Sequence, residues 1–234
     1  MKPRNKRNGG RTLRHTIHSA HSKPTVCRVF YRDANASHIL SQALRQTVQP
    51  HLPERELVVL AIGTDRSTGD ALGPLVGTHL SEMNPSGLPI YGTLDEPVHA
   101  MNLKDAIEQI QKNHPRAYIL SVDACLGPYK HIGMISLTEG SLRPGAGVNK
   151  RLPEVGDLAF TCVVNAGGFM EYFVLQNTRL AHVMKMAQVM ANSIYLAWTH
   201  LQPKVQPERP VITIRSLEKN APLPDEKRHD WQTG

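Results

Sequence analysis

The chain has 234 residues, of which 40% are hydrophobic, so it is long enough for one well-buried domain. No stretch approaches the roughly 20 apolar residues of a membrane span, and no apolar segment follows the basic N-terminus, so we expect a soluble, cytoplasmic protein without a secretory signal. The formal net charge is +7, but seven of the 27 Lys and Arg residues lie within residues 1–24, which leaves 20 basic and 20 acidic residues in the remainder.

The basic excess therefore belongs to an N-terminal arm. Residues 1–24 contain no acidic residue, three histidines and the pair Gly9 and Gly10, with little apolar surface that could pack. This composition predicts a disordered basic extension. The alternative is contact with nucleic acid or another polyanion, because such tails attract polyanions nonspecifically. We expect no nucleic-acid partner except through this arm.

Apolar patterning predicts alternating helices and strands from residue 34 onward. Residues 34–48 form a predicted helix, because apolar residues recur there at helical spacing. The continuous apolar run 57–62 predicts a strand buried on both faces. A polar turn over 63–69 and a helix over 70–83 follow. The next predicted elements are a strand at 90–94, a helix at 102–112, and strands at 118–122 and 132–138.

The C-terminal half continues this pattern. Residues 139–156 contain four glycines and two prolines and predict a loop, and 158–164 predict another strand. A helix is expected from about 177 to 201, with Met184, Met186 and Met190 filling the core. The sequence thus predicts an α/β fold with three layers, in which helices flank a largely parallel sheet. We expect one domain over 25–201 and a tail over 202–234, where 211–214 could form an edge strand.

The turn over 63–74 is the most informative stretch. It joins a buried strand to a helix, at the edge of the sheet where open α/β folds bind ligands. Asp70 has an ordinary explanation there as a helix cap. However, Asp123 follows the predicted strand 118–122 and would reach the same edge of a parallel sheet. Two carboxyl groups brought together can share one proton, so that one activates water while the other acts as an acid.

Four segments resemble the YyaC sporulation family: residues 63–74, 122–127, 143–153 and 164–172. That family is in turn similar to the germination protease of spore formers and to the endopeptidases that mature nickel hydrogenases. The resemblance covers roughly residues 34–200. It implies the fold of the hydrogenase maturation proteases, a phosphorylase/hydrolase-like arrangement.

The likeness to the germination protease implies that Asp70 and Asp123 are the catalytic carboxylates of a peptidase. The segment 144–150 resembles a glycine-rich loop near that enzyme's active site. The substrate-binding residues that this implies are Gly63, Thr64, Asp65, Gly69, Gly145, Gly147, Asn149 and Lys150. Asp65 and Arg66 could pair with substrate or with each other, or be exposed turn residues. Asp95, Glu96 and His99, after the next strand, could line the same edge or be solvated loop residues.

In the hydrogenase maturation endopeptidases an acidic residue at the position of Asp70, an Asp matching Asp123 and a His bind nickel. The corresponding later loop here carries Asn149 and Lys150 instead of a His, and His99 and His131 are the nearest substitutes in sequence. We therefore expect no metal and no cofactor. A Cys125 nucleophile would need a nearby His that no pattern places.

Three hypotheses for the function follow. The favoured one is an aspartate-dependent peptidase of sporulation or germination, acting on a protein or peptide. The second is a binding or scaffold protein that keeps the peptidase fold without turnover. The third is a metal-dependent maturation endopeptidase. A homo-oligomer is possible under each of them, and Asn165, Gly167 and Gly168 are expected either to approach a ligand closely or to form a tight turn.

Overall fold

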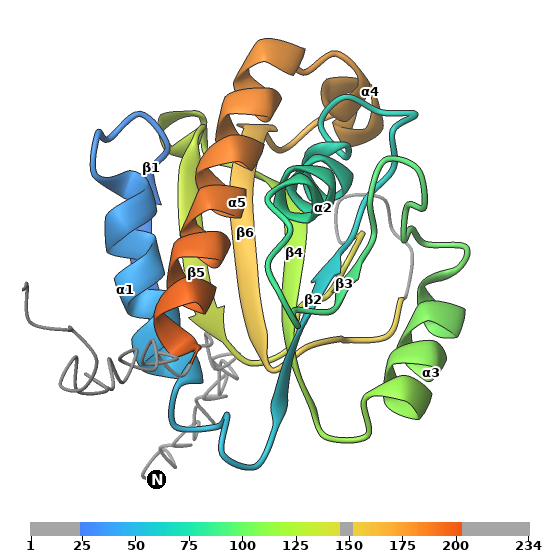
Figure 1. Cartoon of the computed structure of the whole chain (residues 1–234). Helices are drawn as coiled ribbons and strands as arrows, with labels where there is room; N and C mark the ends of the chain where they lie inside the picture. Colours follow the sequence, from blue (N-terminus) through green and yellow to red (C-terminus); the bar gives the residue numbers. More distant parts are fainter. Residues whose placement is uncertain (1–23, 146–151, 203–234) are drawn as a thin grey trace, which may run out of the picture. The chain divides into compact units, whose positions relative to one another are not determined.

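Six strands form one sheet in the order β1-β5-β6-β4-β2-β3 (Figure 1). The structure, a computed structural model, describes residues 24–145 and 152–202. The strands are β1 (Thr25–Phe30), β2 (Glu56–Ala61), β3 (Ile90–Tyr91), β4 (Ala117–Gly127), β5 (Met134–Glu139) and β6 (Leu158–Ala166). Strands β6, β4, β2 and β3 pair in parallel, whereas β5 runs antiparallel to both β6 and β1. The largely parallel sheet is as the sequence predicts.

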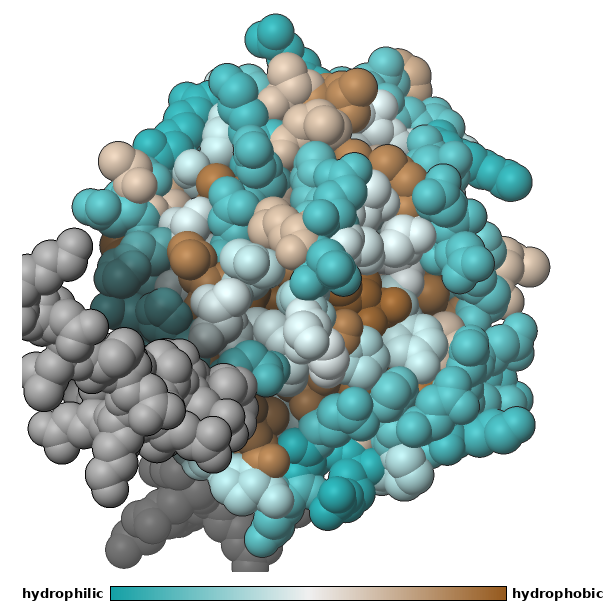
Figure 2. Space-filling view, viewed as in Figure 1, coloured by the Kyte–Doolittle hydropathy of each residue, from teal (hydrophilic) through white to brown (hydrophobic). Residues whose placement is uncertain are grey.

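Helices cover both faces of the sheet, which gives the expected three-layer α/β architecture. They are α1 (Ala36–Val48), α2 (Leu72–Glu82), α3 (Leu103–Asn113), α4 (Glu171–Gln176), α5 (Leu180–Leu201) and a short 3-10 turn, η1 (Tyr129–His131). Helices α1, α2 and α5 share one face, and α3 lies on the other (Figure 1). In Figure 2, which looks onto the first of these faces, hydrophobic residues are scattered among hydrophilic ones.

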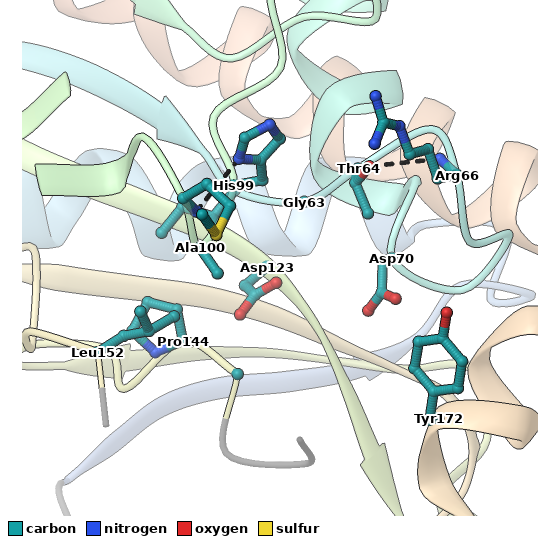
Figure 3. A pocket seen from close by; sticks show the side chains of 13 residues that line it. Gly63, Thr64, Arg66, Asp70, His99, Ala100, Asp123, Pro144, Leu152 and Tyr172 are labelled. Atoms are coloured by element: carbon teal, nitrogen blue, oxygen red, sulfur yellow. Dashed lines mark hydrogen bonds between the residues drawn. The ribbon is translucent and has the colours of Figure 1, made fainter. Parts of the chain in front are cut away.

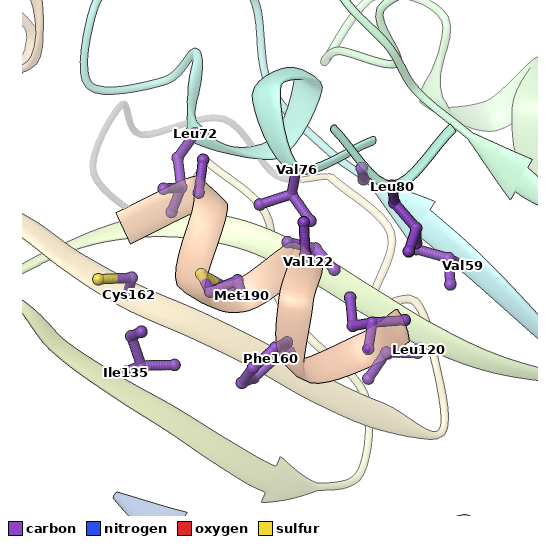
Figure 4. Close-up of a cluster of buried hydrophobic side chains, with 14 of the residues drawn as sticks. Val59, Leu72, Val76, Leu80, Leu120, Val122, Ile135, Phe160, Cys162 and Met190 are labelled. Atoms are coloured by element: carbon purple, nitrogen blue, oxygen red, sulfur yellow. The ribbon is translucent and has the colours of Figure 1, made fainter. Parts of the chain in front are cut away.

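The main core lies between the sheet and helices α1, α2 and α5 (Figure 4). Val122 of β4 and Phe160 of β6 pack there with Val76 of α2 and Met190 of α5, and each is at most 1% exposed. Fully burying a side chain of this size contributes about 1.5–3 kcal/mol. Met186 also fills the core as predicted, but Met184 is 37% exposed, because its position on α5 points away from the sheet.

Strand β2 belongs to two cores at once. Leu57, Val59 and Ala61 pack into the main core, whereas Val58 and Leu60 pack into a second cluster with α3. The second cluster also contains Leu103, Ala106 and Ile110 of α3. The continuous apolar run therefore forms a strand buried on both faces, which confirms the prediction.

Several element boundaries differ from the sequence-based predictions. β1 and α4 were not predicted, because β1 is half-exposed throughout and α4 has one buried residue, Leu175. The predicted strand 118–122 continues to Gly127, since β4 goes on pairing with β6 after its pairing with β2 has ended. Asp123 thus lies within β4 and not after it. The helix expected from residue 70 begins at Leu72.

Some predictions fall on parts of the chain that the structure does not describe. These are the basic arm up to residue 23, the tail from residue 203 with the segment 211–214, and the loop residues Gly147, Asn149 and Lys150. All described residues belong to one compact unit. Within the described ranges, no helix combines the length and apolar character needed to cross a membrane.

Candidate active site

Asp123 occupies the first position of β4 that lies beyond the end of β2. β2 ends at Ala61, which pairs with Val122 of β4. Further along, β4 pairs with β6 alone, and Asp123 lies opposite Thr161. After β2, the N–H groups of Ile62 and Gly63 still donate to the carbonyl oxygens of Val122 and Val98, and the chain then enters the turn that leads to α2. A space therefore opens beside Asp123 at the carboxyl ends of the strands, where α/β folds bind ligands.

The turn that follows β2 carries Asp70 to this space. A Cβ on Gly63 would lie 2.0 Å from the carbonyl oxygen of Asp70, so the chain passes closer to itself here than another residue allows. The N–H of Thr64 donates a hydrogen bond to that same oxygen (3.2 Å). Helix α2 has Ala71 as its N-cap and no side-chain cap. Helix capping therefore does not account for the Asp70 carboxyl group.

Both carboxyl groups line one cavity of about 660 Å³ (Figure 3). Asp70 comes from the β2–α2 turn and Asp123 from β4, and both side chains lie within the close-up of this cavity. An adjoining cavity of about 280 Å³ is also lined by Asp70, Asp123 and Gly145. The larger volume falls within the roughly 300–1,000 Å³ of typical small-molecule sites. The two predicted carboxylates thus share an accessible space.

Burial and mutual repulsion favour the protonated form of Asp123. Burial raises its pKa well above 3.8, and the nearby Asp70 charge raises it further, although the N–H of Ala124 donates a hydrogen bond to Oδ1 (2.8 Å) and opposes the shift. Burial also raises the pKa of Asp70, while the Ser67 hydroxyl lowers it. The shift is the larger one at Asp123, so Asp123 retains a proton at a pH at which Asp70 has lost its own.

Three further polar side chains surround the pair. Nδ1 of His99 accepts a hydrogen bond from the N–H of Met101 (3.3 Å), so the neutral ring carries its hydrogen on Nε2. Arg66 supplies a cation from the turn after β2, and Tyr172 extends from α4 (Figure 3). The site therefore combines a carboxyl pair, a hydrogen-bond donor or base, and a cation.

The structure places the predicted binding residues in different surroundings. Gly63, Thr64 and Gly145 line the larger cavity with the carboxyl pair. Asp65 is exposed and Gly69 is buried against Leu175, and neither lines a cavity. A Cβ on Gly69 would lie 2.8 Å from Leu175 Cδ2, so this glycine allows the turn to pack on α4.

The structure brings one of the two candidate metal-binding histidines to the cavity of Asp70 and Asp123. His99 lines the cavity, whereas His131, in η1, does not, and neither do Asp95 and Glu96. In the described ranges 24–145 and 152–202, no group of three or more His, Cys, Asp or Glu side chains could hold a metal ion.

Cys125 lines the smaller cavity but is poorly suited to nucleophilic attack. Burial and the neighbouring Asp123 charge raise its pKa to about 11, although the Thr161 hydroxyl opposes the shift. At neutral pH the side chain is therefore a thiol, and the thiolate is the nucleophilic form.

Sequence reasoning missed several residues of the cavity wall. Tyr172 and Met101 line it and are 62% and 81% exposed, and Pro144 and Leu152 line it from either side of the segment 146–151. The signal that could have found Tyr172 is the glycine pair Gly167 and Gly168, which precedes a cluster of aromatic residues in a turn. Aromatic residues that follow a glycine pair in this way indicate aromatic side chains exposed on the surface, and a surface position of this kind favours binding over packing.

Comparison with known proteins agrees with the resemblance noted in the sequence. The chain is 53% identical over 158 residues to a protein of Bacillus subtilis (strain 168) described as "Uncharacterized protein YyaC", covering 68% of this chain and 75% of that protein. It is also similar to the crystal structure of the NiFe hydrogenase maturation protease HycI from Thermococcus kodakarensis KOD1. That match has a TM-score of 0.43 and 17% identity, and covers 65% of this chain and 99% of that one, which is too distant to transfer any residue's role.

A family model described as "Protein of unknown function (DUF1256)" matches residues 28–193. This range contains both aspartates, most of α5 and all six strands, apart from the first residues of β1. The chain therefore belongs to this family, and its resemblance to YyaC is confirmed.

Proposed function

We propose that this protein is a peptidase in which Asp70 and Asp123 act as an aspartate pair. The observation that carries the proposal is that the two carboxyl groups line the same cavities and that the charge of Asp70 raises the pKa of Asp123. The fold does not require a carboxyl group at either position. Asp70 caps no helix, and burying a carboxyl group costs stability. Costly groups of this kind cluster at functional sites.

The larger upward pKa shift at Asp123 assigns the roles. Asp70, as the ionised member, takes a proton from a water molecule, whose oxygen attacks the carbonyl carbon of the substrate. Asp123, as the protonated member, then gives its proton to the amide nitrogen while the C–N bond breaks. The products are a carboxylic acid and an amine, and the proton left on Asp70 returns through solvent to Asp123, which restores the pair.

The surroundings of the pair favour a protein or peptide substrate. The cavity is open to solvent, and its wall includes the exposed apolar side chain of Met101 and the exposed aromatic ring of Tyr172. Such walls suit the side chains on either side of a peptide bond. We place this activity in the cytoplasm of a spore-forming bacterium, during sporulation or germination, on the basis of the resemblance to YyaC and the germination protease.

The test uses the full chain with soluble proteins extracted from dormant bacterial spores as the probe. New N-termini are counted by mass spectrometry for the wild type, Asp70→Asn, Asp123→Asn and the control Asp95→Asn, whose side chain is exposed outside both cavities. We expect cleavage by the wild type and the control, and a loss of about 10³-fold or more in either pair variant. Equal cleavage by all four proteins would refute the proposal.

One observation favours a second candidate, a binding protein without turnover. The segment around α4 exposes Phe169, Tyr172 and Phe173, which are 84%, 62% and 57% accessible. Clusters of exposed aromatic residues are typical of protein-interaction surfaces. If no spore protein is cleaved, but a spore protein binds the wild type and Asp70→Asn equally and fails to bind Phe169→Ser, this second function replaces the first.

A further inference from the structure

A separate cavity of about 580 Å³ lies at the ends of β1 and β6 and beside the turn between α4 and α5. It shares no lining residue with the two cavities around Asp70 and Asp123. Three of its lining side chains are basic, namely Arg32, Arg179 and His182, and none is acidic. The remainder of the wall is largely aromatic or apolar.

Among residues 24–145 and 152–202, the basic side chains of this cavity form no ion pair with an acidic residue. Arg32 instead donates a hydrogen bond to the hydroxyl of Tyr31 (3.0 Å), and its guanidinium lies 5.4 Å from that ring's centroid. The ring of His182 lies 6.4 Å from the same ring. The ring of Tyr31 thus lies close to both Arg32 and His182 at the wall of this cavity.

The start of α5 adds a further positive end to this space. The helix is 22 residues long, its N-cap residue is Arg179, and no side chain caps it. Its first turn contains no acidic residue, while His182 lies within that turn. Helix N-termini favour negative charge, so basic residues there are locally unfavourable. Burial and the charges of Arg179, Arg32 and Lys185 lower the pKa of His182. Such local conflicts are typical of functional sites.

We propose that this cavity binds a phosphate monoester that carries an aromatic ring. The phosphate lies between Arg32, Arg179 and His182, where two guanidinium forks and a helix N-terminus match a dianion better than a single carboxylate. The aromatic ring lies against Tyr129 and Phe30, which are 82% and 42% exposed at the cavity wall. A volume of about 580 Å³ suits an organic ligand and exceeds the needs of inorganic phosphate.

The test measures the binding of phenyl phosphate to the full chain by isothermal titration calorimetry at low ionic strength. Inorganic phosphate and benzyl alcohol serve as probes of the two halves of the ligand. We expect phenyl phosphate to bind about tenfold more tightly than inorganic phosphate, and benzyl alcohol to give no measurable heat. Equal affinity of phenyl phosphate and inorganic phosphate would overturn the assignment of the ring.

Charge-matched variants locate the site. Arg179→Gln and Arg32→Gln each remove an exposed charge from the cavity, and we expect about tenfold weaker binding of both phosphates. Arg116→Gln removes the same charge just before β4, outside every cavity described above, and should change the affinity less than twofold. Equal effects of Arg179→Gln and Arg116→Gln would show only nonspecific attraction and would overturn the proposal.

Two more variants separate this site from the carboxyl pair. Tyr129→Ala should weaken phenyl phosphate to the level of inorganic phosphate and leave inorganic phosphate unchanged. Arg66→Gln, in the cavity of Asp70 and Asp123, should leave both affinities unchanged. If Arg66→Gln abolishes binding and Arg179→Gln does not, the anion binds beside the carboxyl pair and the proposal fails, whether or not the protein is a peptidase.

Discussion

The carbonyl oxygen of Asp70 lies against the Cα of Gly63, and a Cβ built on that glycine would approach it to 2.0 Å. The same Cβ would lie 2.7 Å from Cδ of Pro74, at the start of α2. This contact folds the turn after β2 back on itself and carries the Asp70 side chain toward β4. The position of the carboxyl pair therefore depends on a residue that has no side chain.

Gly63→Ala should consequently disturb both stability and the site. The backbone of Gly63 has φ +154°, which disfavours alanine, and the clash is with backbone that cannot rotate away. We expect a loss of about 2–3 kcal/mol in the free energy of unfolding and a loss of peptidase activity beyond the unfolded fraction. Urea unfolding and cleavage of spore proteins measure the two effects.

Gly87→Ala is the matched control for this change. Gly87 has φ +72°, but a Cβ there would meet nothing within 4 Å. It should cost about 1 kcal/mol of backbone strain and leave cleavage unchanged. If Gly63→Ala behaves like Gly87→Ala, the close approach does not position Asp70.

The partly buried carboxyl group of Asp123 should make the fold less stable as the pH rises. Its pKa in the folded state lies well above the ordinary 3.8, so the folded protein binds the proton more tightly than the unfolded chain. The favourable contribution is fully present below pH 3.8 and is lost as the pH rises to the folded-state pKa. Each pH unit crossed in this interval costs about 1.4 kcal/mol.

Asp123→Asn removes this dependence, because the amide does not ionise and its oxygen can still accept from the N–H of Ala124. We expect the variant to gain stability over the wild type, and to gain more at pH 7 than at pH 4. Urea unfolding at both pH values checks this, with Asp95→Asn as the exposed control. A constant difference between wild type and Asp123→Asn would mean that Asp123 titrates normally.

The two roles predict a bell-shaped dependence of kcat/KM on pH. Cleavage requires one proton on the pair, so kcat/KM rises through the lower apparent pKa and falls through the higher one. Burial raises both groups above 3.8, and Asp123 by more, so both limbs should lie above that value. A rate that stays level from pH 4 to pH 9 would exclude a shared proton.

The sequence predicts the layers of this fold well, because continuous apolar runs and helical spacing arise directly from burial. The run at β2 alternates between two cores at Val58 and Val59, and so it remains apolar throughout. β1 lacks such a signal because it is an edge strand with no buried residue. α4 lacks it because most of its side chains face solvent.

The candidate site could be predicted in part. Asp70 and Asp123 were predicted from two strand ends. The structure places them in one cavity, although β4 continues past Asp123 and it is β2 that ends beside it. Tyr172 was not predicted, because the glycine pair before α4 indicates a turn there but not that α4 reaches the cavity of Asp70 and Asp123. Gly69 was predicted to bind substrate, but its backbone packs closely against Leu175, which leaves no room for a side chain. The sequence alone does not distinguish a glycine needed for packing from one needed for binding.

The Cys125 thiol should react slowly with alkylating agents although it lines a cavity. With a pKa of about 11 it remains protonated at pH 7.5. We expect iodoacetamide to modify it at least about 100-fold more slowly in the folded protein than in urea, as followed by mass spectrometry. Rapid modification in parallel with loss of peptidase activity would favour a cysteine nucleophile over the aspartate pair.

Replacing Ser67 changes the electrostatic surroundings of Asp70 while both carboxyl groups stay in place. Its Oγ is buried and makes no hydrogen bond of good geometry among the described residues, yet it lies close enough to Asp70 to lower the pKa of that carboxyl group. Ser67→Ala should therefore raise the Asp70 pKa and move the acidic limb of the kcat/KM profile to higher pH.

The backbone hydrogen bond from the N–H of Ala71 to the carbonyl oxygen of Ser67 (2.9 Å) does not involve the hydroxyl and should persist. A shift of the alkaline limb instead would exchange the roles of the two aspartates, since it would identify Asp70 as the member that retains its proton.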